Sequence, residues 1–360
     1  MSRPAGVRCM LMRGGTSKGA YFLADDLPTE ESVRDELLLR VMGSPDPRQI
    51  DGLGGAHPLT SKVAVVSPST DPEADVDYLF LQVAVDEAEV SNRQNCGNLL
   101  AGVGPFAVER GLVRAGSSES SVRIRMVNSG DFAMATFPTP DGRVDYSGDT
   151  EISGVPGSAA AVVIEFPPQR GKLLPTGNVR DTAAGIEVTC VDNGMPTVLI
   201  PAEALKVTGQ ENPEDLESNR ELTSRLHEIR LAAGQLMGLG DVTGATVPKL
   251  TLLSPPRHGG AVTTRTFIPT RVHTSIGVLG AASVAAGLRM QGSVAQGIAV
   301  LPEEGDRLRI EHPSGFTEIE SSIDHALEGG PRVRRTAIVR TARKIFDGTV
   351  FPVPPTGGRS

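Results

Sequence analysis

The first half of the chain consists largely of short apolar runs separated by turn-forming residues. Each run is at most nine residues long, and most end near Gly, Pro, Asp or Ser, a pattern that is typical of β-strands. Two segments carry apolar residues at helical spacing instead, and these predict helices over residues 31–43 and directly after Cys96. The predicted strands are residues 7–12, 62–67, 77–85, 122–127, 132–137 and 159–166.

The second half of the chain repeats this plan. A charged segment, 212–236, and a segment rich in Gly and Ala, 275–290, predict two helices. The late helix and the helix after Cys96 both carry mainly small side chains, so we call them small-sided, and both are nearly uncharged. We therefore expect each to be surrounded by protein. The predicted strands are residues 185–192, 196–201, 249–255, 260–269 and 293–301.

The length of the chain and the repeated plan predict two domains. A chain of 360 residues is longer than the chains that usually fold around a single hydrophobic core. We expect an α+β protein with two pseudo-symmetric domains, residues 1–180 and 181–350, each with strands wrapped around one central helix. The linker is expected near residues 173–185, and residues 351–360 are expected to form a flexible tail.

The composition excludes several classes of function. The net charge is −8, aromatic residues make up 4% of the chain and Trp is absent, so neither a basic nucleic-acid surface nor an aromatic stacking platform is expected. The N-terminal segment lacks the apolar core of a signal peptide, and no apolar run is long enough for a membrane span. We therefore expect a cytoplasmic protein that binds neither nucleic acid nor membrane.

The cysteines and histidines argue against a metal site. Cys9, Cys96 and Cys190 are widely spaced without a CxxC pair, and the six histidines show neither HxH nor HExxH spacing. Cys9 and Cys190 lie within apolar strand patterns, which favours a structural role for both. We expect no metal, and no cofactor of any kind.

Cys96 is a candidate for proton transfer. It stands between Asn95 and Gly97-Asn98 at the predicted start of a helix, where the helix dipole and free N–H groups favour a thiolate. Such a group can take a proton from carbon or return one, and flanking asparagines can hydrogen-bond a carboxylate. A buried, apolar cysteine explains the pattern equally well.

Lys62 is a candidate base at the start of an apolar strand. It follows a loop with three glycines and the hydroxyls of Thr60 and Ser61. A lysine that loses its water shell can act as a base near neutral pH. A solvated strand entrance is the simpler alternative, and the residues alone favour it.

A third polar segment is the run Gly14 to Gly19, which contains Thr16, Ser17 and Lys18. It departs from the phosphate-loop pattern because its lysine follows the serine, so nucleotide binding is not favoured. A nest of backbone N–H groups beside Arg13 and Lys18 suits a carboxylate. Further polar candidates in predicted loops are Lys249, Arg265, Arg271, His273, His312 and Ser314.

Seven separated segments, in order, resemble the PrpF family. They cover nearly the whole chain, from about residue 6 to 350, and are LMRGGTSKGAYFLADDLP, QIDGLGGAHPLTSKVAVVSPS, QNCGNLLAGVGPFAVERGLV, GVPGSAAAVV, LLPTGN, DNGMP and HPSG. The resemblance implies a cofactor-free isomerase with a diaminopimelate epimerase-like fold, in which two barrel-like mixed sheets each surround a central helix. It also implies a site in the cleft between the two halves, and it leaves room for a homodimer.

The resemblance also implies roles for particular residues. Epimerases of this fold use one cysteine at the start of each central helix, but here only Cys96 matches, because Thr274, Ser275 and Gly277 stand at the second position. A two-thiol mechanism is thereby excluded, and Lys62 becomes the expected partner of Cys96. The residues expected to bind substrate are Thr16, Ser17, Lys18, Ser61, Asn95, Gly97, Asn98, Lys249, Arg271, His273, Ser275 and Ser314.

The expected reaction is a proton transfer within an unsaturated tricarboxylate. The developing enolate charge would meet fixed donors at the helix N-termini. Within the family, the chain is most similar to the keto–enol tautomerases that serve gallate catabolism. Cis–trans isomerisation of an aconitate-like acid and a non-catalytic, tricarboxylate-binding accessory role remain the alternatives.

Overall fold

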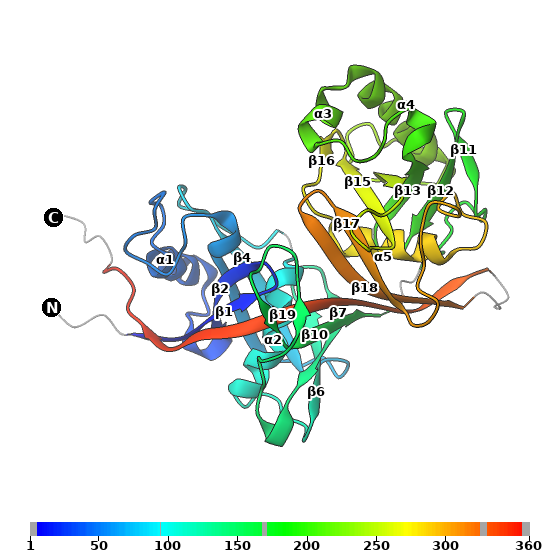
Figure 1. Ribbon diagram of the computed structural model, residues 1–360. Helices are drawn as coiled ribbons and strands as arrows, with labels where there is room; N and C mark the ends of the chain where they lie inside the picture. Colours follow the sequence, from blue (N-terminus) through cyan, green and yellow to red (C-terminus); the bar gives the residue numbers. More distant parts are fainter. Residues whose placement is uncertain (1–5, 94, 168–170, 325–329, 355–360) are drawn as a thin grey trace. The chain divides into compact units, whose positions relative to one another are not determined.

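The computed structural model describes residues 6–93, 95–167, 171–324 and 330–354. These residues fold into two compact units (Figure 1). Unit 1 comprises Met1–Glu165 together with Arg340–Ser360, and unit 2 comprises Phe166–Val339. The predicted domains, 1–180 and 181–350, therefore differ from the observed units. The difference arises because the chain from Arg340 onward belongs to unit 1.

The strands of unit 1 form a closed sheet. Pairing runs from β1 through β2, β3, β4, β6, β7 and β10 to β19, which pairs with β1. The β2–β3 and β4–β6 pairs are parallel, and the other pairs with printed register are antiparallel. The bounds are β1 Val7–Gly14, β2 Ser17–Leu23, β3 Lys62–Pro68, β4 Val76–Val83, β5 Val90–Ser91, β6 Glu119–Met126, β7 Asp131–Pro138, β8 Thr150–Glu151, β9 Ser158–Ala159, β10 Ala161–Phe166 and β19 Arg332–Val350.

Helix α2 (Gly97–Glu109) lies inside this sheet and α1 (Glu31–Met42) lies outside it. All residues of α2 from Leu99 to Ala107 are buried, and the helix contacts strands around the sheet. Helix α1 packs Leu38, Val41 and Met42 against the outer side chains of the strands. Both predicted helices are confirmed, as is the prediction that the small-sided helix is enclosed.

Unit 2 is built from the remaining strands in a mixed sheet. Pairing runs from β11 through β12, β13, β14, β15, β17 and β18 to the first part of β19. The bounds are β11 Asp181–Ala183, β12 Ile186–Asp192, β13 Pro196–Pro201, β14 Lys249–Ser254, β15 Val262–Ile268, β16 Arg271–Val272, β17 Arg307–His312 and β18 Gly315–Asp324.

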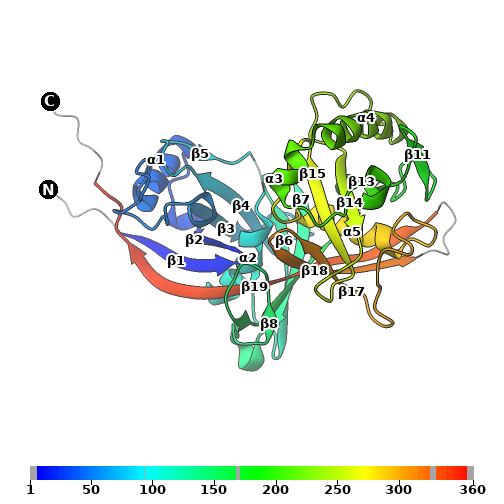
Figure 2. The ribbon, with the colours of Figure 1, turned by 45° about the horizontal axis from the view of Figure 1, so that its top comes forward.

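The helices of unit 2 cover the two faces of this sheet. Helix α5 (Val278–Arg289) packs on one face, where alternate residues such as Leu199 meet it. Helices α3 (Pro213–Ser218) and α4 (Arg220–Leu236) pack on the other face, against Val198 and Ile200 (Figure 2). Successive side chains of β13 therefore point alternately into the core around α5 and into the core under α3 and α4.

The two units repeat one topology. From β1 to β10, the successive pairs are antiparallel, parallel, antiparallel, parallel, antiparallel and antiparallel. From β12 to β19, the order is the same. In each unit the buried helix enters after a two-residue strand, β5 or β16. The predicted α+β fold with two pseudo-symmetric, barrel-like halves is confirmed.

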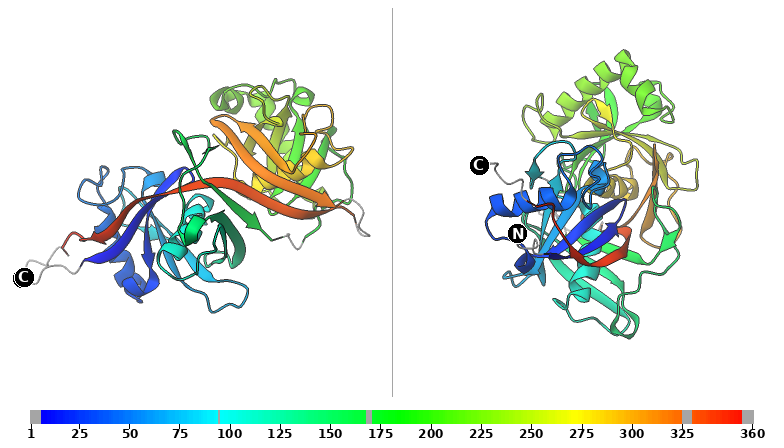
Figure 3. Two further views of the ribbon diagram at one scale, coloured as in Figure 1. Left: turned by 60° about the horizontal axis from the view of Figure 1, so that its bottom comes forward. Right: turned by 90° about the vertical axis from the view of Figure 1, so that its left-hand side faces the viewer.

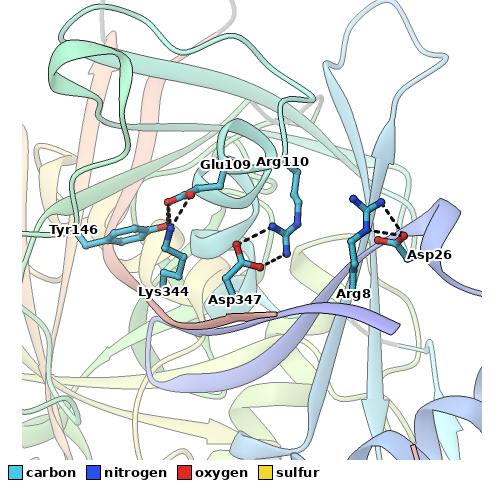
Figure 4. Close-up of polar contacts among 7 residues, drawn as sticks. All are labelled: Arg8, Asp26, Glu109, Arg110, Tyr146, Lys344 and Asp347. Carbon is cyan, nitrogen blue, oxygen red and sulfur yellow. Dashed lines mark hydrogen bonds and ion pairs between the residues drawn. The ribbon is translucent and has the colours of Figure 1, made fainter. Parts of the chain in front are cut away.

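The last part of β19 is fastened to unit 1 by both backbone and side chains. It runs antiparallel to β1 along the whole length of that strand (Figure 3). Lys344 donates to both carboxylate oxygens of Glu109 at 2.7 Å, and Arg110 makes a two-pronged ion pair with Asp347 at 2.7 and 2.9 Å (Figure 4). The C-terminal end of α2 is thus ion-paired with the last part of β19.

Two predictions of single elements are also wrong. Residues 293–301 form turns, because Gly292 and Gly297 have positive φ angles of 83° and 89° that end extended structure. The predicted helix 212–236 is two helices, because Asn219 adopts an extended conformation and its side chain accepts from the Leu222 amide to cap α4.

The predicted tail lies partly beyond the described residues. Residues 355–360 fall outside them, whereas the carbonyl of Val353 accepts a hydrogen bond from Arg40 of α1 at 3.0 Å. No helix among the described residues is long and apolar enough to cross a membrane.

Candidate active site

Cys96 is the N-cap residue of the buried helix α2. Its φ and ψ of −129° and 97° are extended, and its carbonyl accepts the first helical hydrogen bond, from Leu100, at 3.0 Å. The residue is 9% exposed, whereas Cys9 and Cys190 are fully buried. Burial raises the pKa of each of those two thiols to about 12, so both stay protonated at neutral pH. The predicted structural role of Cys9 and Cys190 fits this.

Two buried tyrosines border Cys96. The Tyr78 hydroxyl donates to the Cys96 carbonyl at 3.3 Å, and the Tyr21 hydroxyl donates to the Leu99 carbonyl at 2.6 Å. The pKa of each tyrosine is raised well above its usual value, first by burial and then by electrostatic interaction with Cys96. Both tyrosines therefore act as neutral donors that fix the first turn of α2.

The turn between β1 and β2 packs on the same end of α2. Gly15 has a φ of +53°, and a Cβ there would lie 2.2 Å from Oδ1 of Asn98, so only glycine fits. The Asn98 amide donates to the Thr16 hydroxyl at 3.1 Å and accepts from the Thr16 N–H at 3.4 Å. Ser17 is 1% exposed, and its hydroxyl has no hydrogen-bond partner within the described part of the chain.

Lys62 begins β3, and its ammonium group is held in place. It lies beside Gly19 of β2 and opposite Gln82 of β4. Nζ donates to Oε1 of Gln82 at 2.7 Å and lies 4.9 Å from the centre of the Phe80 ring. Lys62 is only 7% exposed, so the alternative of a solvated strand entrance does not describe it.

Gln82 was missed by the sequence analysis. Its amide donates to the carbonyls of Ser61 and Pro58 at 2.8 and 3.1 Å, which orients Oε1 toward Lys62. Its signal was available, because it is the one amide within the apolar run 77–85.

The loop before β3 is also internally bonded. The fully buried Ser61 hydroxyl accepts from Nε2 of Gln49 at 2.7 Å, so Ser61 holds this loop together. Lys18 is half-buried, and its Nζ lies 3.4 Å from where a Cβ of Gly55 would stand. Asn95 is exposed and donates to the Ser129 hydroxyl at 2.7 Å.

Unit 2 contains a second polar cluster, close in sequence to the start of α5. Lys249 begins β14, as Lys62 begins β3, and each pairs in parallel with the preceding strand of its unit. Burial lowers the pKa of Lys249. The pKa of His273 is lowered by burial and then by Lys249, so its ring is neutral at neutral pH. Nδ1 accepts from the Ser275 N–H at 2.9 Å, which leaves the ring proton on Nε2.

His312 joins the remaining members of this cluster. Its Nε2 lies 3.2 Å from the Ser275 hydroxyl, and its Nδ1 lies 3.3 Å from the Ser314 hydroxyl. The structure therefore brings Ser275 and Ser314 together through a buried histidine. Arg271 is highly exposed and is ion-paired with Glu217 of α3 at 3.5 Å.

Comparisons with known proteins identify relatives along the chain. The family model described as PrpF protein matches residues 5–353. The chain is 57% identical over 350 residues to the 4-oxalomesaconate tautomerase of Pseudomonas putida KT2440, which covers 96% of this chain and 95% of that protein. It is 55% identical over 348 residues to the (4E)-oxalomesaconate Delta-isomerase of Novosphingobium sp. KA1, with 95% and 96% covered.

A solved structure resembles the whole fold. The crystal structure of a methylitaconate-delta-isomerase superposes with a TM-score of 0.86 at 34% sequence identity, covering 98% of this chain and 96% of that one. The fold and the sequence thus point to the same group of isomerases.

Proposed function

The chain belongs to the PrpF family and is an isomerase, and on that premise we propose that it catalyses the keto–enol tautomerisation of 4-oxalomesaconate. The similarity to a tautomerase of that acid, which extends over 96% of this chain, is the observation that carries the choice of substrate.

In the proposed mechanism, Lys62 and Cys96 move the proton. One group removes a proton from the carbon next to the oxo group, and the electron pair of the C–H bond moves into the enolate. A proton is then added to the enolate oxygen, so the product is an isomer and no oxidant or reductant is needed. Lys62 is desolvated and oriented by Gln82, and Cys96 stands at a helix N-terminus, where negative charge is stabilised.

Backbone N–H groups at the start of α2 support binding of a carboxylate or an enolate. The first N–H groups of a helix have no partners within the helix, and here they belong to Gly97 and its neighbours. The Ser17 hydroxyl is a further donor without a partner in the described chain. We propose that Thr16, Ser17, Lys18 and Asn98 act in binding. Substrate binding by Lys249, His273, Ser275 and Ser314 stays a prediction.

An ultraviolet assay of the purified protein tests the substrate, because tautomerisation changes the conjugated system. The panel contains 4-oxalomesaconate, 2-methylaconitate and aconitate. We expect kcat/KM for 4-oxalomesaconate to exceed the others by at least about ten-fold. A preference for either aconitate would select the cis–trans isomerase instead. Binding without turnover of any acid would select the accessory role.

A further inference from the structure

Unit 1 contains a cavity of about 490 Å³. Its lining includes none of the residues assigned to catalysis or substrate binding. It lies between the end of β1, the middle of β19 and the segment 146–159. Its polar lining residues are Arg13, Tyr146, Ser147, Ser158, Thr341 and Arg343, and none of its lining residues is acidic. The volume falls within the usual range for small-molecule sites.

Two arginines that line this cavity lie opposite each other on neighbouring strands. Arg13 of β1 and Arg343 of β19 are directly opposite in the antiparallel register. Side chains at such positions lie on the same face of the sheet about 5 Å apart at Cβ, and like charges there are destabilising. Arg343 contributes to lowering the pKa of Arg13, after burial, which is the larger cause. Lys18 of β2 continues the cationic row on the other side of Arg13.

The surrounding acidic groups do not neutralise this pair. The Tyr146 hydroxyl points to Glu109, at 3.4 Å, but both oxygens of that carboxylate are taken by Lys344. Within the described residues, Arg343 has no carboxylate partner. In a chain with 43 Asp and Glu residues and 35 Lys and Arg residues, these two opposed guanidinium groups thus lack a carboxylate partner among the described residues.

Arg13 is held in a fixed position but keeps donors free. Its Nη1 donates to the carbonyls of Gly15 and Thr341 at 2.9 and 3.0 Å and to the Thr341 hydroxyl at 2.9 Å. Among the described residues, its Nη2 and Nε have no acceptor. The guanidinium fork therefore presents unused N–H groups, the arrangement that binds carboxylate and phosphate oxygens.

We propose that this cavity is a binding site for a small oxyanion, a carboxylate or a phosphate, held between Arg13 and Arg343. The bound anion supplies the missing counter-charge, and the hydroxyls of Ser147 and Ser158 are available as further donors. Because Arg13 also holds the Gly15 carbonyl, the anion steadies the turn that packs on Asn98 at the start of α2.

Thermal unfolding and calorimetric titration of the full chain test this site. The probes are sodium malonate and sodium phosphate, with sodium chloride at matched ionic strength. Arg343→Ala removes one guanidinium, Arg343→Lys keeps the charge without the fork, and Arg143→Ala removes an exposed arginine of the same unit outside the lining.

We expect malonate, phosphate or both to raise the Tm of the wild-type protein and of Arg143→Ala above the chloride control. Arg343→Ala should raise the Kd of the anion by about ten-fold or more, and the Kd of Arg343→Lys should lie between those of wild type and Arg343→Ala. A response to only one of the two probes identifies which oxyanion binds. Without anion, Arg343→Ala should be at least as stable as wild type, because like-charge repulsion is removed.

Equal anion binding by wild type and Arg343→Ala would overturn the proposal. It would mean that the anion binds elsewhere, for example at the start of α2, where Arg343 is not needed. A less stable Arg343→Ala protein without anion would also overturn it. Turnover of 4-oxalomesaconate by Arg343→Ala without added anion should equal that of wild type. Failure of the proposed tautomerase activity leaves the binding measurements unaffected, so the two proposals are tested separately.

Discussion

Cys96 and Lys62 are held by different kinds of contact, and single substitutions distinguish their roles. Cys96→Ala removes a proton donor or acceptor at the N-cap of α2, while the hydrogen bonds of its backbone remain. Turnover should fall by on the order of 10²-fold or more, the scale of a lost acid–base group, while substrate binding and folding are kept. Steady-state kinetics and calorimetry measure these effects. Cys190→Ala is the matched control, and near-wild-type turnover in Cys96→Ala would make Cys96 structural.

Lys62→Arg separates a base from a charged anchor. Arginine keeps the positive charge but is too basic to accept a proton at neutral pH. The variant should bind substrate and exchange no substrate C–H with deuterated solvent. Proton NMR of the substrate in deuterated buffer follows the exchange. If exchange continued at the wild-type rate, Lys62 would be at most an anchor.

His273 should make the stability of unit 2 depend on pH. Its pKa in the folded protein is below the unfolded value near 6.5, because of burial and then of Lys249. The unfolded chain therefore binds the proton first, and stability present above pH 6.5 is lost as the pH falls through the folded value. Urea unfolding between pH 7.5 and 5.5 should show a smaller loss for His273→Gln than for wild type. The exposed His227 provides the control, His227→Gln, and an equal loss in all three proteins would contradict the assignment.

The sequence offers Cys96 as a candidate because a cysteine stands directly before a helix rich in small residues. Lys62 became its expected partner only through the resemblance to the PrpF family, since its local pattern alone favours a solvated strand entrance. Gln82 and Gln49 were not found, because their roles depend on which strands pair and how a loop returns. Arg271 was expected to bind substrate, but its partner Glu217 lies on an element whose position no local pattern reveals.

Among the elements, one glycine in each buried helix shows how differently such positions are packed. A Cβ at Gly102 of α2 would lie 2.4 Å from the buried Tyr21 hydroxyl, whereas at Gly280 of α5 the nearest atom is 3.8 Å away. Gly102→Ala should lower the free energy of unfolding, because overpacking costs about 1–3 kcal/mol and outweighs the gain in helix propensity. Gly280→Ala should be neutral or stabilising by up to about 1 kcal/mol. Urea unfolding measures both, and equal effects would mean that α2 has room to shift.

Element boundaries were predictable where one local signal dominated. Helix α1 ends at Gly43, which has a φ of +81°, as its sequence indicates. The segment 293–301 was predicted as a strand from its apolar residues, but two glycines at positive φ turn it, so that Val294 and Ala295 are buried without extended structure. Apolar content alone does not distinguish a buried turn from a strand.

For the molecule as a whole, catalysis should not depend on a metal. No group of three His, Cys, Asp or Glu side chains in the described ranges could hold an ion. Turnover should be unchanged after treatment with EDTA and exhaustive dialysis, because proton transfer by Lys62 and Cys96 needs no Lewis acid. Loss of activity that a divalent metal restores would contradict this. The same sample, assayed before chelation, is the control.

The repeated plan was predictable because each half places short apolar runs around one helix rich in small residues. The full strand order was not predicted, because β2, β17, β18 and β19 were missing from the predicted strands. Nor was the exact assignment of chain to unit, because it depends on where the final strand pairs. No local pattern marks Arg340 as the point at which β19 passes from one unit to the other.

This placement of β19 sets an order of assembly during synthesis. All of unit 2 has been made once Val339 is added, but the sheet of unit 1 still lacks residues 342–350, which pair with β1. The half of the protein that is translated first is therefore the last to be completed. Until the final strand arrives, β1 is an unpaired edge open to other chains, so a nascent protein halted before Arg340 should be prone to association through that strand.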